Sequence, residues 1–160
     1  PLYRNARKAN LTAEMQDVLF ADASVYLYGN TGVGKTYASM ALIRHEIVRG
    51  KTCKRVNFKS LLLLIRASYT DKEQSEQAVI KPLLDADVSI IDDIGIDATA
   101  FNSTVLYNLV DYRLENLKKT VIISNLSLEK LKDNIDQRLY SRLNMFSVVQ
   151  MRGNDYRLKG

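Results

Sequence analysis

Cysteine, histidine, proline and glycine are all scarce in this sequence, and their scarcity excludes several classes of protein. The 160 residues include one cysteine, Cys53, and one histidine, His45. Neither an internal disulfide nor a zinc site of Cys and His ligands can therefore form, and we interpret His45 as a surface or boundary residue. A lone cysteine suits the reducing cytoplasm, where we expect the protein to work. Seven glycines and two prolines exclude collagen-like and linker-like chains.

Long hydrophobic runs are absent as well. The longest, Leu61 to Ile65, falls far short of the about 20 residues that a membrane-spanning helix needs, and we interpret it as the inner face of a core helix. No secretory signal is visible. Hydrophobic residues make up 46% of the chain and charged residues 26%, which is typical of a folded globular protein and not of a disordered one.

The charge balance is mildly basic. Lys and Arg number 23 against 18 Asp and Glu, which gives a net charge of +5. Such an excess is compatible with nucleic acid as a partner, but it equally describes an ordinary solvated surface. Charge alone leaves both interpretations open.

The length of the chain fits one domain. Because the sequence opens on Pro1 rather than Met, we expect a fragment with something missing upstream. No repeat, low-complexity tract or internal linker divides the sequence. We therefore expect a single domain over residues 1–160, made of a leading segment and helix (1–23), a core (24–152) and a C-terminal tail (153–160).

Short β-rich runs alternate with longer helical ones along the chain. This order predicts an α/β fold, with a parallel sheet of five strands flanked by helices. The strands are expected at residues 24–28, 55–58, 88–92, 120–124 and 146–151. The helices are expected at residues 12–20, 35–49, 59–69, 102–116, 127–135 and 137–143, with one more between a capping box at 70–73 and Pro82.

The strongest chemical signal is a phosphate-binding loop. Gly29-Asn-Thr-Gly-Val-Gly-Lys-Thr36 fits the pattern G-x-x-x-x-G-K-[ST] in full, between a predicted strand and a predicted helix. Glycines let the backbone aim successive N–H groups at phosphate oxygens, Lys35 adds positive charge at the β- and γ-phosphates, and the Thr36 hydroxyl can ligate Mg²⁺. A simple glycine turn would leave the Lys-Thr pair unexplained. The residues predicted to bind nucleotide are Gly29, Asn30, Thr31, Gly32, Val33, Gly34, Lys35 and Thr36.

Two other strand ends carry polar side chains. Asp92 and Asp93 end one apolar run, and Asn125 follows another. Because the carboxyl ends of parallel strands face the ligand crevice, Asp92 is predicted to hold Mg²⁺ and Asp93 to orient or deprotonate the attacking water. The Asn125 amide could hold that water against the γ-phosphate. Alone, each group would fit an ordinary solvated turn, but beside a complete phosphate loop the functional interpretation is favoured.

A pair of arginines follows in a predicted helix. Arg138 and Arg142 are four residues apart, so they lie on one helical face. Their spacing does not distinguish functional arginines from ordinary surface ones.

Four runs accompany the phosphate loop: Ile-Ile-Asp92-Asp93-Ile-Gly, Ile-Ser-Asn125-Leu, Gln-Arg138-Leu-Tyr-Ser-Arg142-Leu and Gly-Asn-Asp-Tyr-Arg157. In combination they resemble the AAA+ ATPase domain of DnaC/DnaI-type replicative helicase loaders, in the IstB/DnaC-like family. The resemblance extends from about Tyr26 to Arg157. IstB-type transposition helper ATPases share the same core.

The resemblance implies a role for each matching residue. It assigns Lys35 and Thr36 to Walker A, Asp92 and Asp93 to Walker B, and Asn125 to sensor 1. Arg142 falls at the family's arginine finger, which reaches the nucleotide of a neighbouring subunit and implies self-association through a nucleotide-bridged interface. Arg157 falls at a sensor-2-like contact with the nucleotide.

The resemblance also implies partners. These are single-stranded DNA and a replicative hexameric helicase, the helicase being bound through an N-terminal domain missing from this chain. In the family, DNA contacts come from the helix after the second strand and the segment after Walker B. The candidate contacts here are Lys54, Arg55, Lys59 and Arg66 for phosphates and Tyr69 and Phe101 for base stacking. Either aromatic residue could equally belong to the core.

Two departures from the family pattern affect these expectations. Asp93 stands where most AAA+ proteins carry Glu, and its shorter side chain predicts slow hydrolysis. Only about ten residues follow the last predicted strand, so we expect the helical lid to be reduced or absent.

We therefore expect an ATPase that uses ATP and Mg²⁺ and couples subunit assembly to single-stranded DNA binding and helicase loading. Two alternatives stay open. One is a nucleotide-gated DNA-binding switch with negligible turnover, which Asp93 favours. The other is an IstB-type transposition helper, which would bind duplex DNA and a transposase. A small-molecule kinase would leave the arginine pair and the Asp-Asp-Ile-Gly run unexplained.

Overall fold

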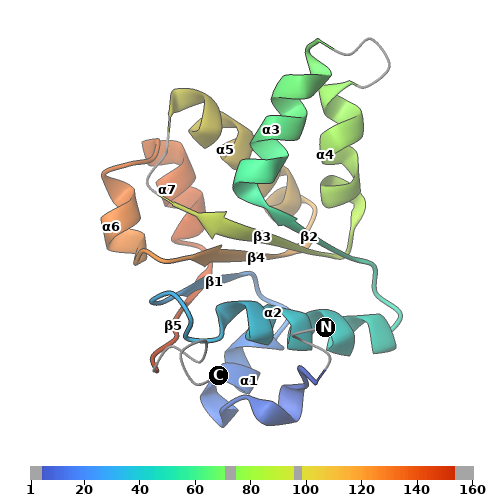
Figure 1. Ribbon diagram of the computed structural model, residues 1–160, viewed down its shortest axis with the longest axis vertical. Helices are drawn as coiled ribbons and strands as arrows, with labels where there is room; N and C mark the ends of the chain where they lie inside the picture. The colour runs from blue at the N-terminus through green and yellow to red at the C-terminus, as the bar shows by residue number, and fades with distance from the viewer. Residues whose placement is uncertain (1–4, 71–74, 96–98, 154–160) are drawn as a thin grey trace.

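The computed structural model describes residues 5–70, 75–95 and 99–153 of the chain. Its centre is a sheet of five parallel strands in the order β2-β3-β4-β1-β5 (Figure 1). The strands are β1 (Val25–Tyr28), β2 (Cys53–Asn57), β3 (Val88–Ile94), β4 (Lys119–Ser124) and β5 (Ser147–Gln150). The predicted α/β architecture with five parallel strands is confirmed.

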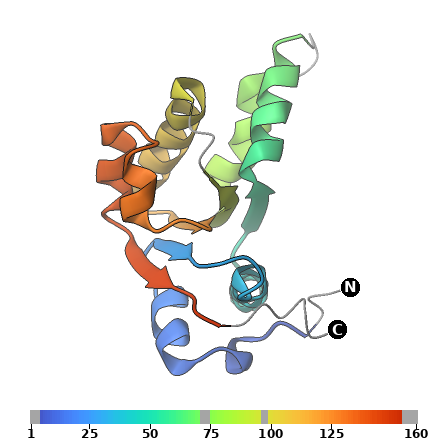
Figure 2. The same ribbon diagram turned by 60° about the vertical axis from the view of Figure 1, so that its left-hand side comes forward.

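Helices cover both faces of the sheet. In chain order they are η1 (Lys8–Asn10, a short 3-10 helix), α1 (Ala13–Leu19), α2 (Lys35–Val48), α3 (Phe58–Ser68), α4 (Glu76–Asp85), α5 (Ala100–Glu115), α6 (Leu128–Lys132) and α7 (Gln137–Leu143). Helices α1 and α2 lie on one face, and the helices from α3 to α7 lie on the other (Figures 1 and 2). Within the described ranges, no helix is both long and apolar enough to cross a membrane.

Alternate residues along the strands pack against the helices on opposite faces of the sheet. In β1, Val25 and Leu27 pack against α1 and α2, while Tyr26 between them packs against the helices of the opposite face. In β4, Val121 and Ile123 repeat the first pattern. Successive strand residues point to opposite faces, so a sheet covered on both sides needs the nearly continuous apolar strands that this sequence provides.

Side-chain caps fix where most helices begin. The residues that accept a hydrogen bond from the backbone N–H of the first helical turn are Thr12, Asn57, Ser75, Thr99, Ser127 and Asp136. One cap corrects a predicted boundary. Because Asn57 caps α3, β2 ends there, and Phe58 is the buried first residue of the helix rather than the last residue of the strand. Such caps are typically worth about 1 kcal/mol each.

Helix α4 also differs from the prediction. It begins after Ser75, whose hydroxyl accepts from the Ala78 N–H, and it continues past Pro82 to Asp85. Residues 71–74, which include most of the predicted capping box, lie outside the described part of the chain. Pro82 was predicted to end the helix. Pro82 cannot donate a backbone hydrogen bond, but the helix continues for one more turn. The carbonyl oxygens of this turn and of Ala86 accept hydrogen bonds from the side chains of Arg113 and Lys118.

The apolar run from Leu61 to Ile65 is only partly internal. Leu61, Leu62 and Ile65 are buried, but Leu63 and Leu64 are 65% and 51% exposed. Five consecutive residues span more than one helical turn, so the prediction that the whole run forms an inner face was wrong. His45 is half-buried and packs edge-on against Phe20, as a boundary residue would.

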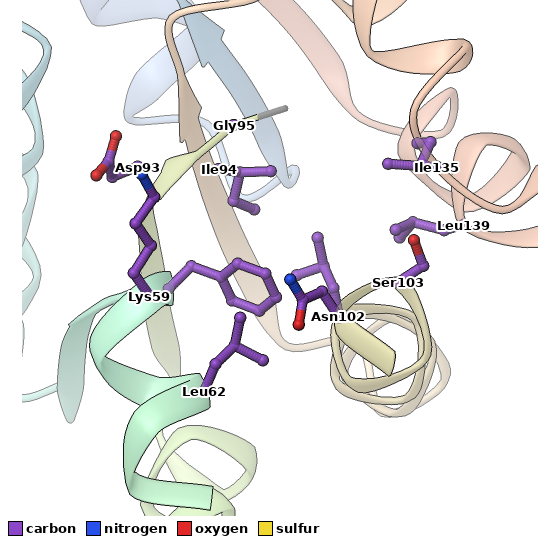
Figure 3. A pocket seen from close by; sticks show the side chains of 11 residues that line it. Lys59, Leu62, Asp93, Ile94, Gly95, Asn102, Ser103, Ile135 and Leu139 are labelled. Carbon is purple, nitrogen blue, oxygen red and sulfur yellow. The ribbon is translucent and has the colours of Figure 1, made fainter. Parts of the chain in front are cut away.

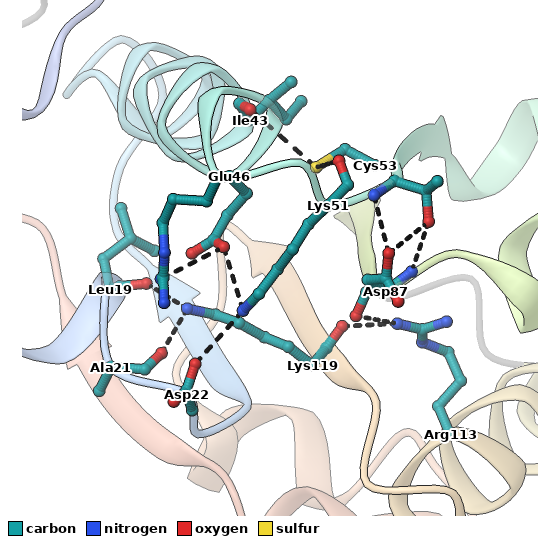
Figure 4. A network of polar contacts seen from close by, with 12 residues as sticks. Leu19, Ala21, Asp22, Ile43, Glu46, Lys51, Cys53, Asp87, Arg113 and Lys119 are labelled. Atoms are coloured by element: carbon teal, nitrogen blue, oxygen red, sulfur yellow. Dashed lines mark hydrogen bonds and ion pairs between the residues drawn. The ribbon is translucent and has the colours of Figure 1, made fainter.

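A buried polar network lies at the amino ends of the strands, away from the phosphate loop (Figure 4). Lys119, the first residue of β4, is 5% exposed and donates to the carbonyls of Leu19 and Ala21. Nearby, Glu46 of α2 is 1% exposed and forms an ion pair with Lys51 at 3.2 Å. Lys119 thus joins β4 to the end of α1, and Lys51, which also pairs with Asp22 at 3.4 Å, joins the segment after α1 to α2.

Candidate nucleotide-binding site

The strand order brings three predicted functional segments to one edge of the sheet. Strand β4 lies between β1 and β3, and all three are parallel. The loop after β1, Asn125 after β4 and the acidic pair in β3 therefore share the carboxyl edge in that order. This is the edge at which ligands bind in open α/β sheets.

The phosphate loop has a backbone that favours glycine. Gly32 and Gly34 have φ values of 81° and 96°, a left-handed conformation that glycine adopts readily. At Gly29 a Cβ atom would lie 2.3 Å from the carbonyl oxygen of Met151, and the Met151 N–H donates to Tyr28 at 2.7 Å. The end of β5 thus packs directly on the start of the loop. This contact of Met151 could not be predicted from the sequence, because only the pairing of β5 with β1 reveals it.

Lys35 occupies the centre of the site. Its side chain is buried, and its ammonium donates to the carbonyls of Gly29 and Asn30 at 2.6 and 2.7 Å. It also donates to Asn125 Oδ1 at 2.8 Å. The structure therefore joins the lysine of the loop to the asparagine at the end of β4, 90 residues later. An ammonium at the N-terminus of α2 adds to the positive end of the helix dipole and favours bound anions there.

Asp92 faces the layer that contains α2. In the β2–β3 register Arg55 pairs with Ile90 and Asn57 with Asp92, and Ile90 packs in the core under α1 and α2. Because alternate residues share a face, Asp92 lies on the same side as Thr36, which stands in the first turn of α2. The Asp92 carboxylate forms an ion pair with the Arg55 guanidinium.

Asp93 lies at an irregularity in the strand. Its φ is 64°, and the β3–β4 register shifts between Ile91 and Ile94. A bulge of this kind redirects one side chain, and aspartate tolerates the left-handed conformation better than most residues. The Asn57 amide donates to Asp93 Oδ2 at 3.3 Å while its oxygen caps α3. Figure 3 shows Lys59 extended toward Asp93 from the first turn of α3.

A small cavity lies beyond Asp93, between α3 and α5 (Figure 3). It measures about 30 Å³, and its polar rim includes Lys59, Asn102 and Ser103. A space of this size admits water molecules.

The two arginines of α7 contact acidic and aromatic side chains of α5 and of the α7 cap. Arg142 Nε lies 2.6 Å from Asp111 Oδ1 of α5, and this carboxylate raises the pKa of Arg142. Arg138 pairs with Asp136 at 3.1 Å and lies 5.0 Å from the Tyr107 ring centre. Helix α7 packs on α5, on the face of the sheet opposite α2. Arg157 lies outside the described residues.

The candidate DNA contacts are distributed over β2, α3 and α5. Tyr69 is 58% exposed, and its hydroxyl donates to Glu76 at 2.9 Å. Phe101 is half-buried against the core, with the Arg66 guanidinium 5.5 Å from its ring centre. Lys54, Lys59 and Arg66 are exposed, whereas the charged group of Arg55 is engaged by Asp92.

The donor set suits magnesium held together with a nucleotide. Among the described residues, no cluster of three or more His, Cys, Asp and Glu side chains could hold a metal ion. Mg²⁺ in nucleotide sites usually takes one or two protein oxygens and completes its shell with water and phosphate oxygens. Asp92 and the Thr36 hydroxyl fit that requirement. Asn57 and Arg55, which contact the acidic pair, were not predicted to do so, because their position beside β3 depends on the strand order.

Comparison with known sequences gives a family and several relatives. Residues 5–160 match the family described as IstB-like ATP binding protein. YdaV of Escherichia coli K12 is 27% identical over 118 residues, 73% of this chain and 47% of YdaV. The replicative helicase loader DnaC of the same strain is 21% identical over 124 residues, 77% of this chain and 51% of DnaC. The chain thus spans about half the length of these relatives.

Solved structures share the fold. A crystal structure of the DnaC helicase loader superposes with a TM-score of 0.79 at 19% identity, covering 94% of this chain and 99% of that one. The replication initiator DnaA, bound to AMPPCP and single-stranded DNA, superposes with a TM-score of 0.81 at 16% identity, covering 98% and 53%. The fold is therefore that of the AAA+ domains of replication proteins.

Proposed function

Because the chain belongs to the family of IstB-like ATP-binding proteins, we propose that it is the ATP-hydrolysing domain of a helicase loader of the DnaC type. In this role Mg·ATP and subunit assembly control binding to single-stranded DNA and loading of a hexameric helicase. The observation that carries the proposal is the contact of Lys35 with both the phosphate loop and Asn125. Asp92 lies two strands from the loop, on the same edge of the sheet.

Nucleotide binding is assigned to the loop and to Lys35. The ammonium of Lys35 donates to two loop carbonyls and one amide oxygen, and it would turn these N–H donors to the phosphate oxygens of a nucleotide bound in the loop. Thr36 and Asp92 would hold Mg²⁺, which, when bound, neutralises charge on the β- and γ-phosphate oxygens. Gly29 keeps the loop free of a side chain where the end of β5 packs against it.

Hydrolysis is assigned to Asp93, Asn125 and Arg142. Asp93 orients or deprotonates the attacking water, and Asn125 holds it near Lys35. Arg142 completes the site of a neighbouring protomer by stabilising charge on the transferred phosphoryl group. Two features support a role in a neighbour: helix α7, which carries Arg142, lies on the face of the sheet opposite α2, and the Arg142 side chain is 38% exposed.

The partners are assigned from relatives. DnaC is named as a replicative helicase loader, and the DnaA structure contains single-stranded DNA. We propose the same two partner classes for this chain, with Tyr69 and the exposed cations of α3 as the DNA contacts. Such a role places the protein in the cytoplasm.

The experiment that tests this function measures ATP turnover per protomer against protein concentration, with and without single-stranded DNA. We expect the specific rate to rise with concentration and to rise further with DNA. Lys35→Ala and Arg142→Ala should each be inactive, whereas their mixture should recover activity. The first variant supplies the arginine and the second supplies an intact nucleotide site. Normal turnover by Arg142→Ala alone would refute the shared site.

Two other functions predict different results. A nucleotide-gated switch, which Asp93 in place of Glu favours, would bind ATP with a near-zero rate at every concentration. A transposition helper would show the same chemistry but would prefer duplex DNA. Comparing the affinities for single-stranded and duplex DNA of equal length distinguishes the helper from the loader.

A further inference from the structure

The carboxylate predicted to hold magnesium already has a cation beside it. Arg55 of β2 and Asp92 of β3 come from adjacent strands, and their side chains share the face that α2 covers. Arg55 Nη2 and Asp92 Oδ2 form an ion pair. Arg55 lies two residues before the position that pairs with Asp92, so its long side chain runs along the sheet to reach the carboxylate.

The pair is specific to Asp92. The neighbouring carboxylate, Asp93, receives its hydrogen bond from Asn57 instead. The side chains of Asp92 and Arg55 are 14% and 33% exposed, so water screens this pair only in part. The two acids therefore have separate partners, both of them supplied by β2.

A guanidinium and a divalent metal ion cannot both occupy the same side of this carboxylate. Both are cations that seek the same oxygen lone pairs, and at contact distance they repel each other. Arg55 is able to leave, because β2 is the edge strand of the sheet that the described residues form and a third of the Arg55 side chain already contacts solvent.

We propose that Arg55 is the resident counter-ion of Asp92 in the nucleotide-free chain, and that magnesium reaches Asp92 by displacing it. This inference rests on the proposed nucleotide site. Arg55 would then set the magnesium concentration that the site requires. Compared with a similar site that lacks the arginine, this site should favour metal-free nucleotide over the magnesium complex.

The size of the effect follows from the strength of a partly exposed ion pair. When a competing contact must open first, the apparent affinity falls by the fraction of molecules that are open. Pairs of this exposure change equilibria by about two- to fivefold. Removing the guanidinium should therefore lower the magnesium requirement by about two- to fivefold.

The test is a magnesium titration of fluorescent ADP binding, started in EDTA, with the midpoint magnesium concentration as the readout. Arg55→Gln removes the charge, Arg55→Lys keeps the charge but loses the planar fork, and Arg44→Gln makes the same charge change at an exposed position on α2. We expect a lower midpoint for Arg55→Gln, an intermediate one for Arg55→Lys and the wild-type midpoint for Arg44→Gln.

Each other outcome has a definite meaning. An unchanged midpoint for Arg55→Gln would refute the competition, and a higher midpoint would mean that Arg55 positions Asp92 for the metal. An equal shift of the midpoint in Arg44→Gln would mean that any loss of positive charge has this effect, and it would also refute the proposal. Failure of the wild-type chain to bind fluorescent ADP at any magnesium concentration would instead refute the proposed function.

Discussion

Lys119 is a buried lysine that releases its proton at a lower pH than an exposed lysine does. Burial lowers the pKa of its ammonium to about 8, and its Nζ donates to two carbonyls, those of Leu19 and Ala21. A neutral amine has two N–H donors, so it satisfies both acceptors without a buried charge. The group therefore links the stability of the fold to pH.

The sign of this linkage follows from the two pKa values. The folded chain releases the Lys119 proton near pH 8, whereas the unfolded chain keeps it until about pH 10.5. Unfolding between these values takes up a proton, so the free energy of unfolding rises with pH in that window. Between pH 7.5 and 9.5 we expect wild type to gain about 1–2 kcal/mol relative to Lys119→Met.

Urea denaturation at a series of pH values measures this difference. Other groups that titrate in the same window are common to both proteins and cancel. Lys130→Met, at an exposed lysine of α6, serves as the control and should follow wild type at every pH. Parallel curves for wild type and Lys119→Met would show that Lys119 keeps its proton in the folded chain.

Arg113 of α5 connects this helix to α4 and β4, and its contacts explain where α4 ends. It is fully buried in α5 and donates to the carbonyls of Leu83, Ala86 and Lys119 and to the hydroxyl of Thr120. Burial lowers the pKa of its guanidinium to about 10. One side chain thus holds the last turn of α4 and the start of β4 on α5.

Replacing Arg113 should loosen all three elements together. Arg113→Met keeps much of the volume but leaves several buried carbonyls without donors, each worth about 1–3 kcal/mol. We expect a loss of at least about 3 kcal/mol in the free energy of unfolding, measured by urea denaturation. Arg44→Met, at an exposed arginine of α2, should change it by less than about 0.5 kcal/mol. Equal stability of the two variants would contradict the role of Arg113.

The sequence predicted the ends of a helix correctly where a local capping residue and the spacing of its apolar residues determine them. Helix α7 begins and ends at the predicted residues, because Asp136 caps it and its apolar residues have helical spacing. The prediction was wrong at Phe58, where the cap by the neighbouring Asn57 decides, and at Pro82, where distant groups decide. The burial of Phe58 and the capping of α4 by Arg113 depend on tertiary packing that no short window contains.

The candidate site shows the same division. The phosphate loop, Asn125 and Asp92 could be located from motifs, since each ends or follows a predicted strand and carboxyl ends of parallel strands share an edge. The contacts of Arg55 and Asn57 with the acidic pair could not, because they require the knowledge that β2 lies beside β3. The contact of Met151 with Gly29 likewise needs the position of β5.

At the scale of the molecule, the two ends of the sheet have separate tasks. The carboxyl edge collects the phosphate loop, Asn125 and the acidic pair, while the amino edge holds the buried network of Lys119 and Glu46 (Figure 4). Changes at the amino edge should therefore alter stability without altering the nucleotide site. The proposed function depends on whether the carboxyl edge of the sheet binds nucleotide through Lys35.

The most direct test of that claim is a calorimetric titration of the chain with Mg·ATP. We expect saturable binding of one nucleotide per protomer in wild type, and a loss of affinity of at least about 100-fold in Lys35→Ala, because in the proposed site the ammonium would contact the phosphates directly. Lys130→Ala should bind as wild type does. Equal affinity of wild type and a folded Lys35→Ala would contradict the account.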